Sequence, residues 1–178
     1  MSGMIENMAL KLAIKIKNLE PNQTASVEVM KFSIEALLNN LITLVLVLVL
    51  AICTDSVFLA LMGLIAFSVL RFFSGGYHFK NSITCSIVST IIIFVSTQIE
   101  LSHNYFVLLS VISLIIVLIY APANIANHAR IDSKYFPLLK IVATIIVLSS
   151  VIIVSSTVTL AVFFQSLTLL IPNKEVGI

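Results

Sequence analysis

The sequence predicts an all-α, polytopic membrane protein with about six transmembrane helices, preceded by an amphipathic N-terminal surface helix. The chain of 178 residues is 60% hydrophobic and only 10% charged, and its mean hydropathy is +1.15. Its long apolar runs lack the alternation of polar and apolar side chains that the strands of a membrane barrel require. Helices satisfy every backbone hydrogen bond within a lipid-exposed segment, so the spans are expected to be helical.

The first expected element is the amphipathic helix over residues 4–19. Apolar side chains recur at helical spacing along one face, and lysines and asparagines occupy the rest of the surface. A segment this short and polar cannot cross a bilayer, so we expect it to lie on the membrane surface beside lipid headgroups. The apolar face comprises Ile5, Met8, Leu12, Ile16 and Leu19.

Six apolar segments, separated by polar turns, are the expected spans. The last apolar stretch, residues 138–171, contains a single charge, Lys140. As one helix it would be about 51 Å long, against a hydrocarbon core of about 30 Å. We therefore expect a break near residues 154–159, with one long tilted helix as the alternative. The expected spans are residues 36–53, 57–70, 83–99, 105–120, 138–154 and 157–171, within a single integral membrane domain, residues 1–178.

The basic residues predict the orientation of these spans. All ten Lys and Arg side chains fall on one side of the membrane, whereas the turns on the other side contain Asp55, Glu100 and His103. By the positive-inside rule the basic side is cytoplasmic. Both termini, residues 71–82 and residues 121–137 are then expected on the cytoplasmic side.

The segment "RFFSGGYHFKNSITCS", residues 71–86, gathers residue types that are rare elsewhere in the chain. It contains Gly75 and Gly76, one of three histidines (His78) and one of two cysteines (Cys85). A thiolate is the nucleophilic form of cysteine, and a nearby imidazole can accept the thiol proton. The positive end of a helix dipole favours a thiolate, and its N–H groups can bind an oxyanion. These residues predict a Cys–His nucleophilic site.

His78 and Cys85 can meet only if His78 lies outside the helix that carries Cys85. On a straight helix, residues with this spacing are separated by about 10.5 Å along the axis, too far for a hydrogen bond. Gly75 and Gly76 allow the chain to fold back over the helix start, because glycine adopts backbone conformations closed to other residues. Ser82 is the expected N-cap, which leaves His78 in the preceding loop.

The same residues have plainer interpretations. A cysteine in a membrane helix commonly packs as a small apolar side chain, as we expect for Cys53. The pair His78 and Cys85 does not make a metal site, and His103 is expected across the membrane, so we expect no metal and no cofactor. The alternative function is a non-enzymatic subunit of a small transporter or sensor, although no expected span carries a charge at its centre.

Arg71, Gly75-Gly76, His78 and Cys85, in this order and spacing, resemble the signature of the AgrB family (accessory gene regulator B), the membrane-embedded cysteine endopeptidases of bacterial quorum sensing. The resemblance extends to the amphipathic N-terminus, to "VEVMKFSIEALLNNL" at the start of the first span and to "YAPAN" after the fourth. It implies a multi-pass protein of the bacterial cell membrane with its catalytic residues at the cytoplasmic face.

The resemblance also implies a substrate and a reaction. The substrate is a separately encoded, short precursor peptide (AgrD-like), from which Cys85 releases an acidic C-terminal tail, with His78 as general base and then acid. A Cys or Ser side chain of the bound peptide then closes a thiolactone or lactone ring. Arg71 binds a substrate carboxylate with its planar fork or anchors the helix at the interface, and Gly75 and Gly76 give structural support. We further expect contact with membrane lipid, a homodimer, and no nucleic acid, since the net charge is only +2.

Overall fold

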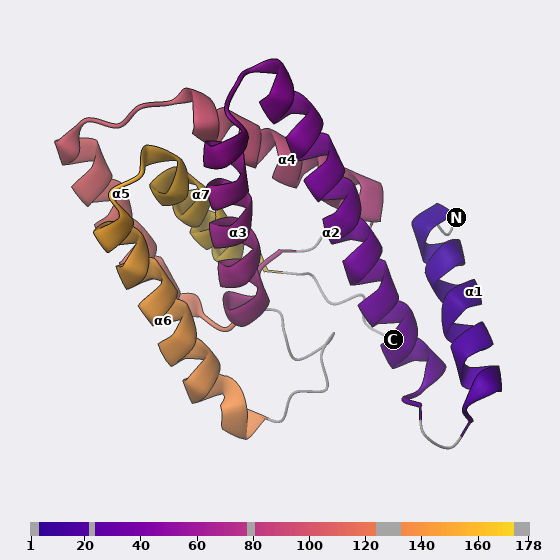
Figure 1. Ribbon diagram of the computed structural model, residues 1–178. Helices are drawn as coiled ribbons and strands as arrows, with labels where there is room; N and C mark the ends of the chain where they lie inside the picture. Colours follow the sequence, from indigo (N-terminus) through magenta and orange to yellow (C-terminus); the bar gives the residue numbers. More distant parts are fainter. Residues whose placement is uncertain (1–3, 22–23, 78–80, 124–132, 173–178) are drawn as a thin grey trace. The chain divides into compact units, whose positions relative to one another are not determined.

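The computed structural model describes residues 4–21, 24–77, 81–123 and 133–172. In these residues the regular elements are helices (Figure 1), which confirms the predicted all-α fold class. The helices are α1 (Met4–Leu19), α2 (Val27–Cys53), α3 (Val57–Ser74), α4 (Ser82–Gln98), α5 (His103–Tyr120), α6 (Phe136–Ile153) and α7 (Ser156–Leu167), with short 3₁₀ helices at Ser133–Tyr135 and Thr168–Leu170.

Six of these helices are apolar, as a polytopic membrane protein requires. Within the described ranges, α2, α3, α5 and α6 are long and apolar enough to cross a membrane by length and composition. The helix α4 and the stretch Ser156–Leu170 are apolar but shorter. The helix α2 also includes the polar segment that precedes the first predicted span.

The apolar stretch near the C-terminus is broken into two helices, as its length predicts. The helix α6 ends at Ile153, and Val154 adopts the left-handed conformation, with φ 49° and ψ 47°. Ser155 then caps α7, because its hydroxyl accepts a hydrogen bond from the N–H of Val158. The serine thus supplies a partner for one of the N–H groups that a new helix start leaves without one.

The helix α1 buries one isoleucine and two alanines and leaves its other large apolar side chains exposed. Ile5, Ala9 and Ala13 are buried at four-residue spacing, whereas Met8 and Leu12 are 48% and 43% exposed. The buried face therefore shares only Ile5 with the predicted apolar face. The exposed apolar side chains are the ones a membrane surface could cover.

The chain folds as two compact units. The first comprises Met1–Leu46 and Phe79–Thr90, and the second comprises Val47–His78 and Ile91–Ile178. The helices α2 and α4 are each divided between the two. The first unit contains the start of α4 and therefore Cys85, whereas α3, α5, α6 and α7 belong to the second.

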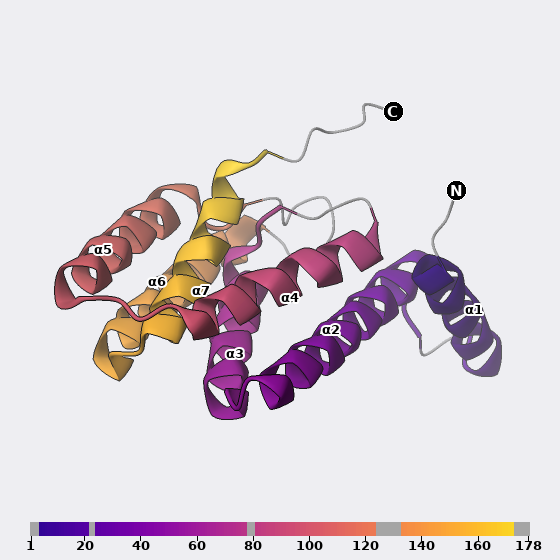
Figure 2. The same cartoon turned by 90° about the horizontal axis from the view of Figure 1, so that it is seen from above.

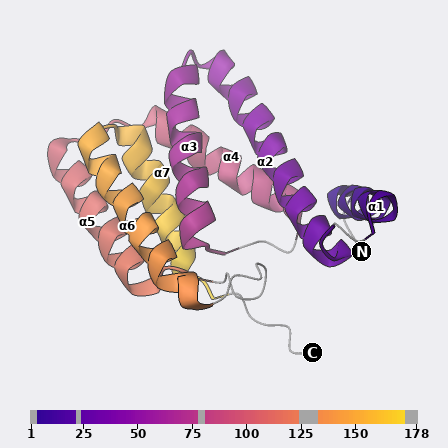
Figure 3. The ribbon, with the colours of Figure 1, turned by 60° about the horizontal axis from the view of Figure 1, so that its bottom comes forward.

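Four helices form the core of the second unit. The helix α7 packs against both α3 and α5 (Figure 2), and α6 also packs against α3 and α5, so that the four lie side by side (Figure 3). All four helices contribute buried residues to the central apolar cluster. These residues include Leu70, Val117, Val147 and Val162, one from each helix.

The helices α3 and α7 approach closely at Gly63. A Cβ atom added there would lie 3.0 Å from Cγ2 of Thr157 and 3.7 Å from Cγ2 of Ile93. In membranes, small residues allow such approaches, and helix association then depends on close packing. This contact helps to set the position of α7, whose other end meets the turn that follows α3.

Candidate functional site

Cys85 lies in the first turn of α4, in the first compact unit. Its side chain is only 4% exposed, and its N–H donates to the carbonyl of Asn81 over 3.2 Å. Asn81 caps the helix, because its Oδ1 accepts a hydrogen bond from the N–H of Ile83 over 3.0 Å. The prediction that Ser82 caps this helix is wrong. The Ser82 hydroxyl instead donates to Oε1 of Glu35. Because α4 already begins at Ser82, the cap position is the residue before it, Asn81.

Two side-chain hydrogen bonds tie the start of α4 to α2. Ser82 donates to Oε1 of Glu35 and Ser86 donates to Oδ1 of Asn39, each over 2.6 Å. The partners are four residues apart on both helices, so the two bonds share one face of each helix. The sequence analysis does not pair these residues, although the matching four-residue spacings are a visible signal.

The turn after α3 requires glycine at both Gly75 and Gly76. The φ angle is 71° at Gly75 and 132° at Gly76, values that residues with a side chain rarely adopt. The N–H of Gly76 donates to the carbonyl of Ala123 over 3.1 Å, and the N–H of Ala123 donates to the carbonyl of Ser74 over 2.9 Å. A Cβ atom on Gly76 would overlap Oγ1 of Thr168. The segment after α5 and the end of α7 therefore both hold this turn.

Arg71, in the last turn of α3, directs its guanidinium toward other groups of the second unit. Its Nη2 donates to the carbonyl of Tyr77 over 2.8 Å, and its Nη1 donates to Oε1 of Gln165 over 3.4 Å. The guanidinium carbon also lies 5.8 Å from the centre of the Phe67 ring, within the range of a cation–π contact. These contacts link Arg71 to the glycine turn that follows it.

Gln165 of α7 also belongs to this arrangement, although the sequence analysis does not single it out. Its side chain is fully buried, and its Nε2 donates to the carbonyl of Gly75 over 2.8 Å. The available signal is one amide in a helix of otherwise apolar and hydroxyl-bearing side chains. A polar group of this kind inside a membrane helix commonly has a specific partner.

Other predicted features stand apart from this arrangement. His78 lies outside the described residues, so its contact with Cys85 stays a prediction. Cys53, which the sequence predicts to pack, is instead exposed at the end of α2, and the two cysteines form no disulfide. In the part of the chain that the structure describes, no three His, Cys, Asp or Glu side chains gather to hold a metal ion.

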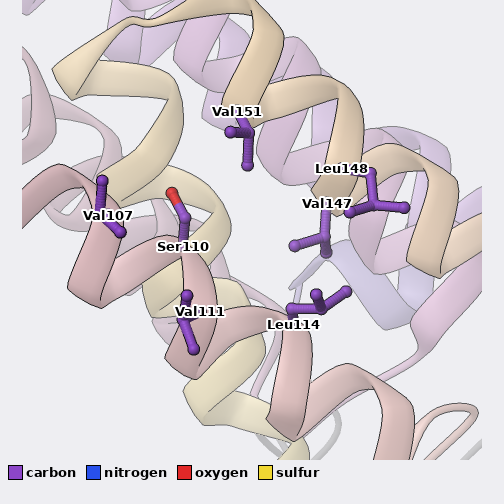
Figure 4. A pocket seen from close by; sticks show the side chains of 7 residues that line it. All are labelled: Val107, Ser110, Val111, Leu114, Val147, Leu148 and Val151. Atoms are coloured by element: carbon purple, nitrogen blue, oxygen red, sulfur yellow. The ribbon is translucent and has the colours of Figure 1, made fainter.

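Two cavities of the second unit lie among mainly apolar side chains. One, of about 100 Å³, is formed by α5 and α6 around Ser110 (Figure 4). The Ser110 hydroxyl is buried and has no hydrogen-bond partner among the described atoms. Another, of about 340 Å³, lies between α3, α6 and α7. Neither is lined by a residue of the predicted site.

These features define a class of protein: an α-helical membrane protein with several spans, a buried cysteine at the start of one helix, and a glycine turn that the last helix holds. Among known families, accessory gene regulator B (AgrB) matches residues 5–171, and the chain belongs to this family.

The chain is also similar to individual AgrB-like proteins. It is 34% identical over 102 residues to an AgrB-like protein of Halalkalibacterium halodurans. The aligned residues make up 57% of this chain and 52% of that protein. It is 32% identical over 89 residues to AgrB-like protein 2 of Clostridium perfringens. Here the aligned residues make up 50% of this chain and 42% of that protein. The chain thus spans about half the length of the curated relatives it matches. Comparison with solved structures gives no match.

Proposed function

We propose that this protein is a membrane cysteine endopeptidase that removes the C-terminal tail of a short, AgrD-like precursor peptide and assists its cyclisation into a quorum-sensing autoinducer. The observation that carries the proposal is the burial of Cys85 in the first turn of α4, one turn after its cap Asn81. Family membership points to the same peptide processing. The proposed catalytic residues are Cys85 and His78.

In the first proposed step, His78 takes the proton of the Cys85 thiol, and the thiolate attacks a backbone carbonyl of the precursor. The new C–S bond gives a tetrahedral intermediate, and the peptide C–N bond then breaks. His78 returns the proton to the leaving nitrogen, so the tail departs with a neutral amine and the rest of the peptide stays as a thioester. The N–H groups in the first turn of α4 are suited to stabilise both the thiolate and the oxyanion.

In the second proposed step, a Cys or Ser side chain of the bound peptide attacks the thioester carbonyl. Its proton passes through His78 to the departing sulfur of Cys85, which restores the enzyme and leaves a thiolactone or lactone ring. The thioester reaches this step only if water does not hydrolyse it first. The low exposure of Cys85, 4%, supports such protection.

We propose that the reaction takes place at the cytoplasmic face of the bacterial cell membrane. The basis is the positive-inside rule, applied to ten basic residues on one side of six proposed spans. The exposed apolar side chains of α1 support its contact with the membrane surface. In a background without native cysteines, an impermeant maleimide added to cells should label His103→Cys and spare Lys80→Cys. Labelling at position 80 from outside would overturn the orientation.

The test of the peptidase proposal is a trapped acyl-enzyme. When the ring-forming Cys or Ser of the precursor is replaced by Ala, cleavage remains possible and ring closure does not. The wild-type protein should then accumulate the peptide on Cys85 as a hydroxylamine-sensitive adduct, or release it slowly as a linear acid. Cys85→Ala should give neither adduct nor cleaved peptide. The matched control Cys53→Ala should behave as the wild type, since Cys53 has no part in the proposed chemistry.

A non-enzymatic transporter or sensor subunit, the alternative function, predicts no covalent adduct at a single residue. Cleavage at the normal rate by Cys85→Ala would overturn the peptidase proposal and favour this alternative.

A further inference from the structure

Gln165 is a fully buried amide in a helix whose other side chains are apolar or carry a hydroxyl. Burying an amide without partners is costly, especially where the surroundings are lipid. Gln165 uses both halves of its amide: Nε2 donates to the carbonyl of Gly75 over 2.8 Å, and Oε1 accepts from Nη1 of Arg71 over 3.4 Å. The reversed amide would set its NH₂ group against the guanidinium, so only this orientation satisfies both neighbours.

The residue that follows α7, Thr168, also meets the same turn. Its carbonyl accepts a hydrogen bond from the N–H of Tyr77 over 3.1 Å. Its hydroxyl donates to the carbonyl of Gln165 over 2.7 Å, which fixes the orientation of the Thr168 side chain. A Cβ atom on Gly76 would overlap Oγ1 of Thr168 and lie 3.1 Å from Nε2 of Gln165. The absence of a side chain at Gly76 therefore allows the turn to lie directly against the end of α7.

Arg71 adds a third connection to this part of the backbone. Its Nη2 donates to the carbonyl of Tyr77 over 2.8 Å, so Tyr77 is hydrogen-bonded through both its N–H and its carbonyl. That carbonyl belongs to the peptide bond that joins Tyr77 to His78. The backbone of Tyr77, the residue before the proposed base, is thus held through both of its polar groups.

We propose that Gln165 is a positioning residue for the peptidase reaction: it holds the carbonyl of Gly75 and one arm of Arg71, and through them the glycine turn that precedes the proposed base, His78. This inference rests on the proposed function and deepens it, because it gives the last helix a role in catalysis. Gln165 and Gly75 are 90 residues apart in the sequence, so the reaction comes to depend on the packing of α7 against α3. In this role Gln165 acts through His78 and does not touch the substrate.

The test uses the chain of 178 residues in lipid vesicles. The protein carries the change Cys53→Ser, so that Cys85 is the one cysteine left of the two in the sequence. Gln165→Met keeps an unbranched, flexible side chain of similar length but removes both hydrogen bonds. Ser166→Ala is the matched control, because Ser166 is equally buried and its hydroxyl donates to the carbonyl of Val162 in its own helix.

Two measurements are made on each variant. The first is the single-turnover rate of precursor cleavage as a function of precursor concentration. The second is the rate at which iodoacetamide alkylates Cys85, measured from about pH 6 to about pH 10. This range extends to both sides of about 8.5, the ordinary pKa of a free cysteine thiol. The second measurement reports thiolate formation without any contribution from the substrate.

We expect Gln165→Met to lower the maximal cleavage rate about tenfold to a hundredfold, with little change in the precursor concentration that gives half the maximal rate. Ser166→Ala should stay near the wild type. Alkylation of Gln165→Met should be slow at neutral pH, because a displaced His78 no longer assists thiol ionisation. It should reach the wild-type rate at high pH, where the thiol ionises unaided.

Normal cleavage with an unchanged pH profile in Gln165→Met would overturn the inference. Alkylation that is lost at every pH would also overturn it, because Gln165 would then serve only to maintain the fold. The two proposals fail separately. Cleavage by Cys85→Ala would refute the peptidase itself, whereas an inactive Cys85→Ala beside a normal Gln165→Met would refute only the role of Gln165.

Discussion

Ser86, the residue after Cys85, donates its hydroxyl hydrogen to Oδ1 of Asn39 over 2.6 Å. Ser86 is fully buried, and the backbone carbonyl of Asn39 offers its hydroxyl a second acceptor at 3.2 Å. Asn39 therefore acts together with Glu35 of the same helix to hold the first turns of α4 in place within the first unit. The position of Cys85 is set by this contact as well as by its own helix.

Asn39→Leu should weaken both the fold of the first unit and the proposed cleavage. The change removes the closer acceptor of a buried hydroxyl, at a cost of about 1 kcal/mol, while the longer bond to the backbone can remain. We expect a lower thermal midpoint in detergent and slower cleavage of the precursor. Asn40→Leu is the control, since Asn40 is exposed on the same helix. Equal effects at the two positions would contradict a specific role for Asn39.

Glu35→Leu should be more harmful than Glu35→Gln. Ser82 donates to Oε1 of Glu35 over 2.6 Å, and glutamine keeps an acceptor oxygen that leucine lacks. A hydrogen bond to a charged group is worth about 1.5–3 kcal/mol, and the half-buried position of Glu35 favours the lower end. Thermal unfolding and cleavage assays should rank the variants in this order. If the exposed control Glu28→Leu is as harmful as Glu35→Leu, the bond to Ser82 contributes little.

Gly76→Ala should be poorly tolerated, in contrast to Gly63→Ala. The φ angle of 132° at Gly76 is unfavourable for any side chain, and the new Cβ atom would overlap Oγ1 of Thr168. Backbone strain of this kind costs on the order of 1–3 kcal/mol. At Gly63 the backbone is helical, and the nearest atom, Cγ2 of Thr157, would lie 3.0 Å from the new Cβ atom, so the conflict is smaller. Unfolding in detergent measures both, and equal stability of the two variants would contradict the described turn.

Much of the fold could be predicted from the sequence because lipid restricts the choice of structure. Continuous apolar runs in lipid must be helices, and a run too long for the bilayer must tilt or end. The break at Val154 lies within the predicted region, next to a serine that can cap the following helix. The two shorter apolar helices, α4 and α7, also follow the predicted segments.

The contacts that hold the site could not be predicted in the same way. Periodicity reports which face of a helix is apolar, but it does not report which distant side chain a polar group will meet. Gln165 lies 90 residues from Gly75, and Ser86 lies 47 residues from Asn39. Such pairs depend on how the helices pack, which a single sequence does not record. The place of Cys85 at a helix start is a local property, and the sequence does predict it.

Arg71→Lys should slow cleavage although it preserves the positive charge. Arg71 donates to the carbonyl of Tyr77 and to Oε1 of Gln165 through two different nitrogens. Lysine has one nitrogen on a flexible stem and cannot reproduce this planar fork. We expect the single-turnover rate to fall about tenfold, measured with the purified protein and precursor in vesicles. Near-normal cleavage would reduce Arg71 to an anchor at the membrane interface.

The substrate can separate the two remaining roles of Arg71. If its guanidinium binds a carboxylate of the precursor, a tail with Asn and Gln in place of its acidic residues should slow the wild type as much as Arg71→Lys does. The two changes together should then be no worse than either alone. If Arg71 instead supports the glycine turn, the neutral tail should slow both proteins by the same factor, because independent effects on the free energy add. The contacts of Arg71 with Tyr77 and Gln165 lead us to expect this second result.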